Sequence, residues 1–256
     1  MNIQNNVVLI TGGTSGFGLE FAKQLLNLGN TVIITGRNQA KLDETKKLFP
    51  QVHTFKSDVS DPNAIVELYE KVTKQFPNLN VLINNAGEMR KINLNDTSNN
   101  LHTIDREINT NLLGPIRMVQ QFLPHLKSQN SATILNVTSG LALVPFPISP
   151  IYGASKSGLH SYTISLRIQL KNSNVKVFEL LAPAAKTPLN DKFEGDVDAK
   201  SLMDTDKLIE VAIKGLQKDQ FEIYPGVAKV LKLMSKLAPT FILKQLSKPV
   251  EKMLNR

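Results

Sequence analysis

The sequence predicts an α/β fold in which a parallel sheet is covered by helices on both faces. Short apolar, β-branched segments alternate with segments of helical spacing along the 256 residues. The apolar segments are apolar throughout rather than at every second position, which is typical of parallel strands buried on both faces. The first of them is followed by a glycine-rich turn and a helical pattern. We therefore expect a doubly wound sheet with ligands at the carboxyl ends of its strands.

The expected elements alternate along the chain. Strands are expected at residues 6–11, 31–35, 52–56, 81–84, 133–138 and 175–181, with a short seventh at 221–224. Helices are expected after the first strand and at about 38–48, 61–76, 98–127 and 152–170. Asp61 and Pro62 are typical of an N-cap and a first helical residue. Gly114 and Pro115 predict an interruption of the longest helix.

Composition fits one domain at 1–225, with 226–256 as a basic amphipathic helical extension of the same domain. Hydrophobic residues make up 41% and charged residues 20%, which are ordinary globular values. Cysteine is absent and the four histidines lack ligand spacing, so we expect no metal site. No signal-peptide pattern and no apolar run of about 20 residues occur, so a cytoplasmic location is expected.

The net charge of +8 is concentrated in the extension, which holds seven basic residues and Glu251 as its one acidic residue. The rest of the chain is close to neutral, so no nucleic-acid partner is expected. Two apolar stripes lie in the extension on either side of Pro239, at Val227, Val230, Leu231, Met234 and Leu237 and at Phe241, Ile242, Leu246, Val250 and Met253. The sequence favours packing of these stripes on the body or a second subunit. Peripheral contact with an anionic membrane is the alternative.

A glycine-rich turn joins the first strand to the first helix. Gly12, Gly16 and Gly18 stand in the segment Thr-Gly-Gly-Thr-Ser-Gly-Phe-Gly at 11–18. Backbone N–H groups and the helix dipole at such a turn face an anion that side chains would block. A flexible turn that needs positive φ is the alternative. The segment therefore predicts a site for the pyrophosphate of a dinucleotide.

Tyr152 and Lys156 lie four residues apart on a predicted helix, so their side chains share a face. A nearby ammonium group is expected to lower the pKa of the phenol from about 10, so that Tyr152 can exchange a proton with an alcohol oxygen. Ser139 follows the strand at 133–138 and is expected to face the same space. The spacing by itself also occurs on helices in which the tyrosine only packs.

Together these motifs resemble the short-chain dehydrogenase/reductase family, in its compact branch, and in particular the DltE-type oxidoreductases. The resemblance runs from Thr11 to about Leu189 and includes Asn84-Asn85-Ala86-Gly87. It implies a Rossmann-like sheet of about seven strands in the order 3-2-1-4-5-6-7. It also implies that the cofactor is held by Gly12, Thr14, Ser15, Gly16, Phe17, Gly18, Arg37, Asp58, Val59, Asn85, Ala86, Gly87, Tyr152, Lys156 and Thr187.

The resemblance implies four catalytic residues. Tyr152 would exchange the proton, Ser139 would orient the substrate oxygen, Lys156 would hold the ribose, and Asn111 would hold a water that connects Lys156 to solvent. Two structural alternatives stay open, because Ser139 could simply end a strand and Asn111 could kink or cap a helix. Ala182-Pro183 stands where the family usually has Pro-Gly, so we expect an altered loop with hydride transfer retained.

The residues after the second strand favour NADP(H) over NAD(H). NAD-specific sites place a carboxylate there, whereas this chain has Thr-Gly-Arg-Asn at 35–38 and no carboxylate until Asp43. Arg37 offers a planar fork for a 2′-phosphate, and Thr14 or Ser15 adds a hydroxyl. The alternative is that Arg37 caps a surface turn.

These features predict an NADP(H)-dependent enzyme that interconverts a small-molecule carbonyl and an alcohol, as a homodimer or homotetramer. A catalytically idle dinucleotide-binding sensor or scaffold is the main alternative, and a dehydratase or epimerase is a third. The substrate is expected between segments 88–98, 140–151 and 184–203, the last of which reads as a polar lid. The sequence names no compound.

Overall fold

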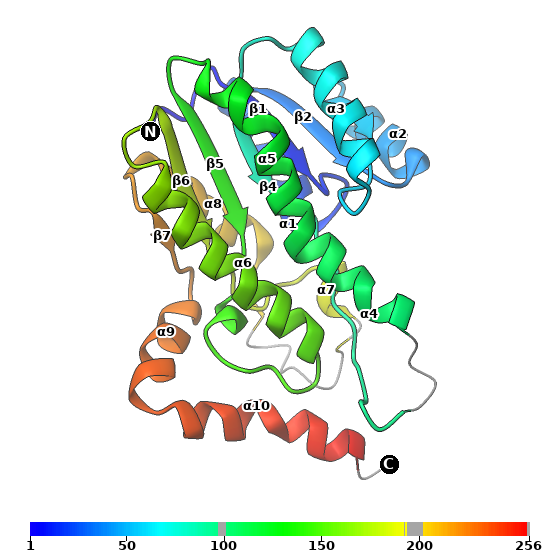
Figure 1. Cartoon of the computed structure of the whole chain (residues 1–256), viewed down its shortest axis with the longest axis vertical. Helices are drawn as coiled ribbons and strands as arrows, with labels where there is room; N and C mark the ends of the chain where they lie inside the picture. The colour runs from blue at the N-terminus through cyan, green and yellow to red at the C-terminus, as the bar shows by residue number, and fades with distance from the viewer. Residues whose placement is uncertain (97–100, 192, 194–201, 255–256) are drawn as a thin grey trace.

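The computed structural model describes residues 1–96, 101–191, 193 and 202–254, and within them seven strands form one parallel sheet (Figure 1). The strands are β1 (Val7–Thr11), β2 (Thr31–Gly36), β3 (His53–Lys56), β4 (Leu79–Asn84), β5 (Ala132–Val137), β6 (Val175–Leu180) and β7 (Glu222–Ile223). Their order in the sheet is β3-β2-β1-β4-β5-β6-β7, and every pairing is parallel. This confirms the predicted fold class and strand order.

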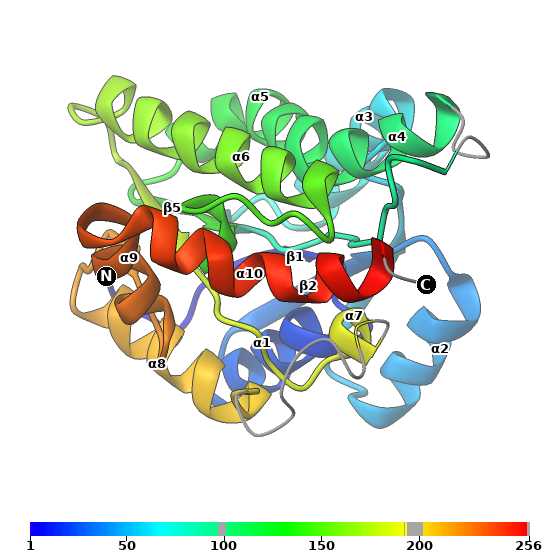
Figure 2. The same ribbon diagram turned by 90° about the horizontal axis from the view of Figure 1, so that it is seen from below.

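Helices cover both faces of the sheet (Figure 2). They are α1 (Gly16–Asn27), α2 (Gln39–Leu48), α3 (Pro62–Gln75), α4 (Leu101–Ile108), α5 (Gly114–Lys127), α6 (Pro150–Gln169), α7 (Pro188–Asp191), α8 (Thr205–Gln217), α9 (Ala228–Leu237) and α10 (Pro239–Leu254). Apolar residues of α1 and α8 pack on one face of the sheet, and those of α3, α5 and α6 pack on the other. The continuous apolar strands of the sequence are therefore buried on both sides.

The helix expected at 98–127 is interrupted near Gly114 and Pro115, as predicted. A π-helical segment at Asn109–Leu113 separates α4 from α5, and α5 begins at Gly114. Pro115 lies in the first turn of α5, where its missing N–H costs no helical hydrogen bond. Gly114 is needed because a Cβ there would lie 3.0 Å from the backbone oxygen of Val59. The interruption therefore lies just before Gly114 and Pro115, and Asn111 belongs to its π-helical turn.

The chain reverses its direction across the sheet at β1, whose neighbours are β2 and β4. Such a switch point leaves a crevice outside the carboxyl ends of the strands. The turn before α1 and the segment after β4 lie at this point. The fold therefore brings together the motifs at 11–18 and 84–87.

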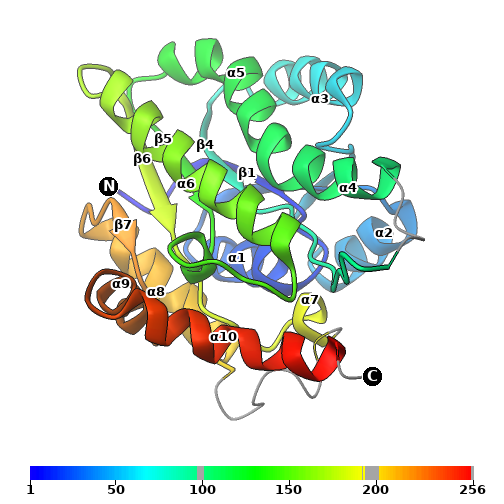
Figure 3. The same ribbon diagram turned by 60° about the horizontal axis from the view of Figure 1, so that its bottom comes forward.

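The C-terminal helices lie at the carboxyl edge of the sheet (Figures 1 and 3). In α9, Ala228 is buried, whereas α10 has no buried residue in its described length. Helix α10 crosses this edge from the side of α9 toward α7 (Figure 2). Both helices were predicted, but α8 was not, although Leu208, Ile209 and Ala212 give it an apolar face.

Candidate active site

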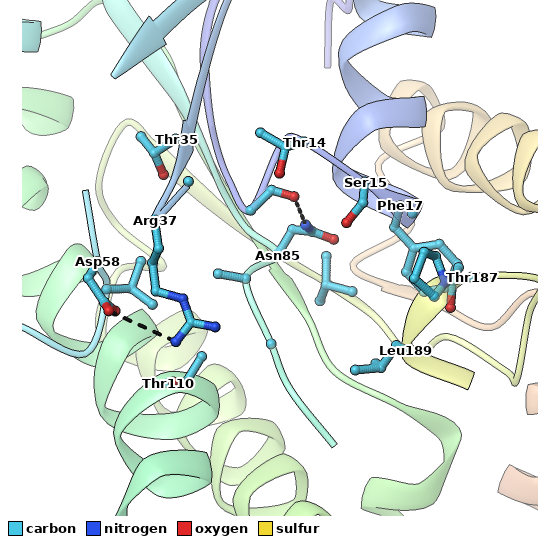
Figure 4. Close-up of a pocket in the computed structure, with 18 of the residues that line it drawn as sticks. Thr14, Ser15, Phe17, Thr35, Arg37, Asp58, Asn85, Thr110, Thr187 and Leu189 are labelled. Carbon is cyan, nitrogen blue, oxygen red and sulfur yellow. Dashed lines mark hydrogen bonds and ion pairs between the residues drawn. The ribbon is translucent and has the colours of Figure 1, made fainter. Parts of the chain in front are cut away.

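One cleft at the switch point collects nearly all the predicted cofactor residues (Figure 4). Of the predicted set, Gly18 is the one that does not line it. The cleft is lined by Gly12, Thr14, Ser15, Gly16, Phe17, Thr35, Gly36, Arg37, Asn38, Lys41, Ser57, Asp58, Val59, Asn85, Ala86, Gly87, Thr110, Val137, Thr138, Tyr152, Lys156, Thr187, Pro188 and Leu189. Segments from β1, β2, β4, β5 and α6 thus share one ligand-sized space.

The glycine-rich turn can adopt its path only with glycine at several positions. Gly12 and Gly16 have φ of 67° and 52°, which side chains rarely adopt. A Cβ on Gly12 would lie 2.9 Å from the Cα of Ala86, and one on Gly18 would lie 2.2 Å from the oxygen of Gly12. Gly18 therefore acts by allowing α1 to approach the turn closely, and not by lining the cleft.

Hydrogen bonds from the segment after β4 hold this turn in place. The side-chain amide of Asn85 donates to the carbonyl oxygens of Thr11 at 2.9 Å and Gly12 at 3.2 Å. The Thr11 hydroxyl oxygen accepts the backbone N–H groups of Asn85 and Ala86, each at 3.0 Å. The turn at 11–18 and the segment at 84–87 therefore form one rigid unit.

Arg37 reaches into the cleft from the end of β2 (Figure 4). Its guanidinium lies 4.0 Å from Asp58 and 3.8 Å from Glu88, and its side chain is 49% exposed. Glu88 is held more closely by Arg106, at 2.9 Å. Because the two Arg37 ion pairs are long, the guanidinium keeps donors for a further anion. Lys41, which sequence reasoning missed, adds a second cation to this part of the cleft.

Two hydroxyl groups in the cleft have no hydrogen-bond partner among the described residues. They belong to Thr35 and Thr110, and both oxygens are buried. Unpaired buried hydroxyls are costly unless a ligand or water satisfies them. Together with the glycine cradle, they show that the residues present fit a polar, phosphate-bearing ligand.

Tyr152 lines this cleft, whereas Ser139 does not, although its hydroxyl is close enough to act on the Tyr152 phenol. Tyr152 is 6% exposed. Ser139 accepts the backbone N–H of Leu141 at 3.1 Å and donates to the carbonyl oxygen of Ala182 at 3.4 Å. Burial raises the pKa of Tyr152 to about 12, the Ser139 hydroxyl lowers it, and the charge of Glu107 raises it. At neutral pH the phenol is therefore protonated.

This direction is opposite to the effect predicted from the Tyr-Lys spacing. Lys156 does lie on the same face of α6, with its Nζ 5.8 Å from the centre of the Tyr152 ring. However, its ammonium group donates to the carbonyl oxygen of Val137 at 2.9 Å. Burial lowers the pKa of Lys156 to about 8, and the charge of Glu179 raises it. The prediction failed because spacing gives a shared face but not the cost of burying both groups.

A buried carboxylate, missed in the sequence, lies behind Lys156. Glu179 of β6 is fully buried, accepts the Thr138 hydroxyl at 2.6 Å and contacts Nδ1 of His160 at 2.9 Å. This contact raises the pKa of His160, and burial lowers it. Thr138 lies between Val137, which binds Lys156, and Ser139. The hydrogen bonds of Glu179 therefore hold the carboxyl end of β5 in place.

Asn111 lies in the π-helical segment and is fully buried. Its side-chain oxygen accepts the backbone N–H of Glu88 at 2.9 Å, and its amide donates to the Glu88 carbonyl oxygen at 2.8 Å and to Ser155 at 3.1 Å. A Cβ on Gly87 would lie 3.4 Å from the Asn111 oxygen and 3.7 Å from Lys156 Nζ. Both side chains therefore border Gly87.

The space next to Tyr152 is apolar. Met89, Phe146, Ile148 and Phe193 pack with Tyr152, and the cluster is completed by Leu141, Leu189, Leu246 and Val250. The last two belong to α10. The predicted walls 88–98 and 140–151 both contribute, although 97 and 98 lie outside the described residues. Of the predicted lid, 192 and 194–201 also lie outside them.

In the loop after β6, neither Ala182 nor Pro183 has a positive φ. Among the described residues, positive φ outside glycine occurs at Asn5 and Asp219 alone. The loop instead pairs with Met203, through Met203 N–H to Ala184 at 3.1 Å and Lys186 N–H to Met203 at 3.1 Å. It places Thr187 beside Gly16, where a Cβ would lie 3.4 Å away. Thr187 reaches the cleft as predicted.

The sheet, the glycine cradle and the buried Tyr152 and Lys156 beside it define a dinucleotide-dependent oxidoreductase. The family model for short chain dehydrogenases matches residues 6–198. The chain therefore belongs to the short-chain dehydrogenase family, whose members are oxidoreductases acting on CH–OH groups with a nicotinamide dinucleotide.

Individual relatives agree with this assignment. The chain is 41% identical over 227 residues to the uncharacterized oxidoreductase DltE of Bacillus subtilis, covering 87% of this chain and 89% of the relative. A short chain dehydrogenase from Burkholderia cenocepacia, solved with NADP, has a TM-score of 0.83 at 22% identity over 96% of this chain and 99% of that one. A 3-ketoacyl-(acyl-carrier-protein) reductase from Brucella melitensis, solved with NADH, has a TM-score of 0.76 at 28% identity, covering 84% and 91%.

Within the described part of the chain, no group of three or more His, Cys, Asp or Glu side chains could hold a metal ion. No helix in that part is long and apolar enough to cross a bilayer.

Proposed function

We propose that the protein reduces a carbonyl compound to an alcohol, or catalyses the reverse reaction, with NADP(H) as cofactor and Tyr152 as the proton donor or acceptor. The observation that carries this proposal is that Tyr152 and Lys156 line the same cleft as the glycine cradle. A dinucleotide in the cleft would thus lie beside an acid–base group. An idle sensor needs the cradle but has no use for Tyr152, Lys156 and Ser139 together.

The proposed reaction assigns one task to each residue. When bound, the nicotinamide supplies the hydride that reaches the carbonyl carbon. Tyr152 donates its phenolic proton to the carbonyl oxygen, and Ser139 donates a hydrogen bond to the same oxygen. The raised pKa of Tyr152, about 12, keeps the phenol protonated at neutral pH, as reduction requires.

The remaining residues position the reacting groups and replace the proton that Tyr152 gives up. Lys156 would bind the ribose hydroxyls of the nicotinamide half and stabilise the phenolate that forms as Tyr152 gives up its proton. Asn111 keeps the segment after β4 in register through Glu88 and borders Gly87 beside Lys156. We assign it a water that links Lys156 to solvent, along the route by which the Tyr152 phenolate regains a proton after reduction. Glu179 supports the charge on Lys156.

The preference for NADP(H) rests on the end of β2. Arg37 and Lys41 both line the cleft, and the guanidinium is 49% exposed there. A 2′-phosphate would accept charge-assisted hydrogen bonds from them, whereas the hydroxyl of NAD(H) would leave them unused. Asp58 and Val59 border the same region and would contact the adenine.

The substrate that suits this site carries an apolar chain. Phe146, Phe193 and Ile148 surround Tyr152 together with side chains of α10. One relative is the fatty acyl-CoA reductase of Acinetobacter baylyi, 29% identical over 192 residues, covering 73% of this chain and 65% of the relative. We propose an aldehyde or ketone whose apolar chain packs in this cluster. We also propose that the enzyme works in the cytoplasm as a homodimer or homotetramer, which light scattering would measure.

Turnover over a substrate panel tests the function. NADPH and NADH oxidation would be followed with short-chain and long-chain aldehydes and ketones. We expect NADPH oxidation that rises with chain length and is slower with NADH. Binding of NADPH with no turnover of any carbonyl would contradict the reductase and favour the sensor. Equal use of both nucleotides would contradict the role given to Arg37.

A further inference from the structure

Exposed large apolar side chains are concentrated in the C-terminal helices. Of the thirteen large apolar side chains exposed in the described residues, seven lie between residues 227 and 254. Val230, Leu233 and Leu237 recur at i, i+3 and i+7, so they form one stripe on α9, and they are 56%, 56% and 71% exposed. Phe241 at the start of α10 is 55% exposed. An exposed apolar stripe of this kind marks an interaction surface.

Exposed lysines lie on both C-terminal helices. Lys229 and Lys236 of α9 and Lys244, Lys248 and Lys252 of α10 are all exposed. None of the five forms an ion pair with a described residue, whereas Lys232 turns inward to Glu222 at 3.1 Å. We name these five lysines, together with Val230, Leu233, Leu237 and Phe241, the basic apolar surface.

The charge decides between two occupants of the basic apolar surface. Residues 226–256 carry seven basic residues against one acidic residue. Self-association about a twofold axis would bring two such surfaces together, and their charges would repel. An anionic lipid surface attracts the lysines and accepts the apolar stripe at its interface. The observations therefore favour a membrane over a second copy of the chain.

Helix α10 connects this surface to the active site. Leu246 and Val250 pack on the cluster that contains Tyr152, while the lysines of α10 are exposed. The helix crosses the carboxyl edge of the sheet, where the cleft lies (Figure 3). Because no described residue of α10 is buried, its packing on this cluster is shallow.

We propose that the basic apolar surface docks on an anionic phospholipid bilayer, and that the apolar substrate reaches Tyr152 from this side, past α10. The docking rests on the exposed residues alone. The substrate route rests in addition on the proposed reductase function. Contact is peripheral, in keeping with the lack of a membrane-crossing helix among the described residues.

Cosedimentation of the full-length protein with vesicles tests the docking. Phosphatidylcholine vesicles would be compared with vesicles that also contain phosphatidylglycerol. We expect pelleting only with the anionic vesicles, and release by salt because the lysine contribution is screened. Failure of the protein to pellet with anionic vesicles would overturn the proposal.

Matched variants locate the contact. The triple variant Lys244→Glu, Lys248→Glu, Lys252→Glu is expected to lose at least about tenfold in vesicle affinity. The control variant makes the same charge change at three exposed lysines, Lys74→Glu, Lys127→Glu and Lys171→Glu. The first two lie in the last turns of α3 and α5, and the third lies just after α6. This control should bind as the wild type does. Equal losses in both variants would overturn the assignment to α10. Circular dichroism confirms that both remain folded.

The apolar stripe is tested in the same way. Leu237→Ser should weaken vesicle binding, whereas Ile168→Ser, at a position on α6 that is 62% exposed, should not. If Leu237→Ser instead dissociates a dimer in the absence of vesicles, a second copy covers the stripe and the proposal fails. Absence of carbonyl turnover with intact vesicle binding would refute the reductase and leave the docking standing.

Discussion

The cleft and helix α10 both lie at the carboxyl edge of the sheet, but they differ in how firmly their residues are held. Around the cleft, Asn85 and Asn111 each make two or more hydrogen bonds to neighbouring segments, Ser139 makes one to Ala182, and Gly12 and Gly18 allow contacts that no side chain would permit. At α10, by contrast, no described residue is buried, and Phe241 is more than half exposed. The first region is organised for geometry, whereas we propose that the second contacts a lipid surface.

This contrast separates the effects that substitutions should have. Changes in the cleft should alter nucleotide binding, catalysis and stability together, because the same backbone supports all three. Changes on the outer side of α9 and α10 should leave the isolated protein almost unaffected. The predictions below test this separation.

The largest effect on binding is expected for Gly18→Ala. Its Cβ would lie 2.2 Å from the carbonyl oxygen of Gly12, so the glycine-rich turn must shift. We expect a loss of about 1–3 kcal/mol in the free energy of unfolding, and NADPH affinity reduced at least about tenfold. Urea denaturation and calorimetric titration measure the two effects.

Gly29→Ala is the matched control for that variant. Gly29 has φ of 78° but its Cβ would meet nothing closer than 4.0 Å, and it lies outside the cleft. It should lose about 1–2 kcal/mol of stability from backbone strain alone and bind NADPH normally. A normal NADPH affinity in Gly18→Ala would show that the turn does not hold the nucleotide.

Arg37→Leu should change nucleotide preference. Loss of charge-assisted hydrogen bonds to the 2′-phosphate predicts NADPH affinity reduced about 10–100-fold, with NADH affinity nearly unchanged. Lys47→Leu removes an exposed charge of α2 outside the cleft and should alter neither. Parallel losses for NADPH and NADH would contradict the assignment of Arg37 to the phosphate.

Lys156→Met should reveal the cost of burying an ammonium group. The pKa of Lys156 is lowered to about 8 in the folded protein, from 10.5, so the unfolded chain binds more protons between these values. Stability contributed by this position therefore rises with pH across that window. Relative to the variant, the wild type should gain on the order of 2–3 kcal/mol from pH 8 to 10.5. A constant difference in urea denaturation would contradict the lowered pKa.

The smallest effect is expected for Leu237→Ser. This side chain is 71% exposed on α9, so its removal should change the free energy of unfolding by less than about 0.5 kcal/mol. Thermal denaturation of the isolated protein measures this. A loss of more than about 1 kcal/mol would mean that the stripe is covered in the free protein, and the contrast with the cleft would fail.

Much of the fold could be predicted because local signals were strong and consistent. Continuous apolar runs identified the strands, and the glycine pattern at 11–18 located the cleft. The interruption near Gly114 and Pro115 was predicted, but its π-helical form at Asn109–Leu113 was not, because contacts such as that of Gly114 with Val59 shape it. Tertiary contacts decided that element.

Most of the predicted site residues line one cleft, but the electrostatics of that cleft were not predicted. Spacing placed Tyr152 and Lys156 on one face, yet the direction of the Tyr152 pKa depends on burial and on Glu107. Glu179 and His160 come from different elements, so no sequence spacing joins them. Lys41 and the unpaired hydroxyls of Thr35 and Thr110 were missed for the same reason.

The most direct test of the account compares NADPH binding and turnover in Tyr152→Phe and the wild type. The hydroxyl is the atom that donates the proton, and its loss leaves the glycine cradle intact. The account predicts NADPH affinity within about twofold of the wild type and a carbonyl reduction rate lower by about 10²–10⁴-fold. Turnover at the wild-type rate would contradict the role of Tyr152, and with it the central claim that this cleft is a reductase site.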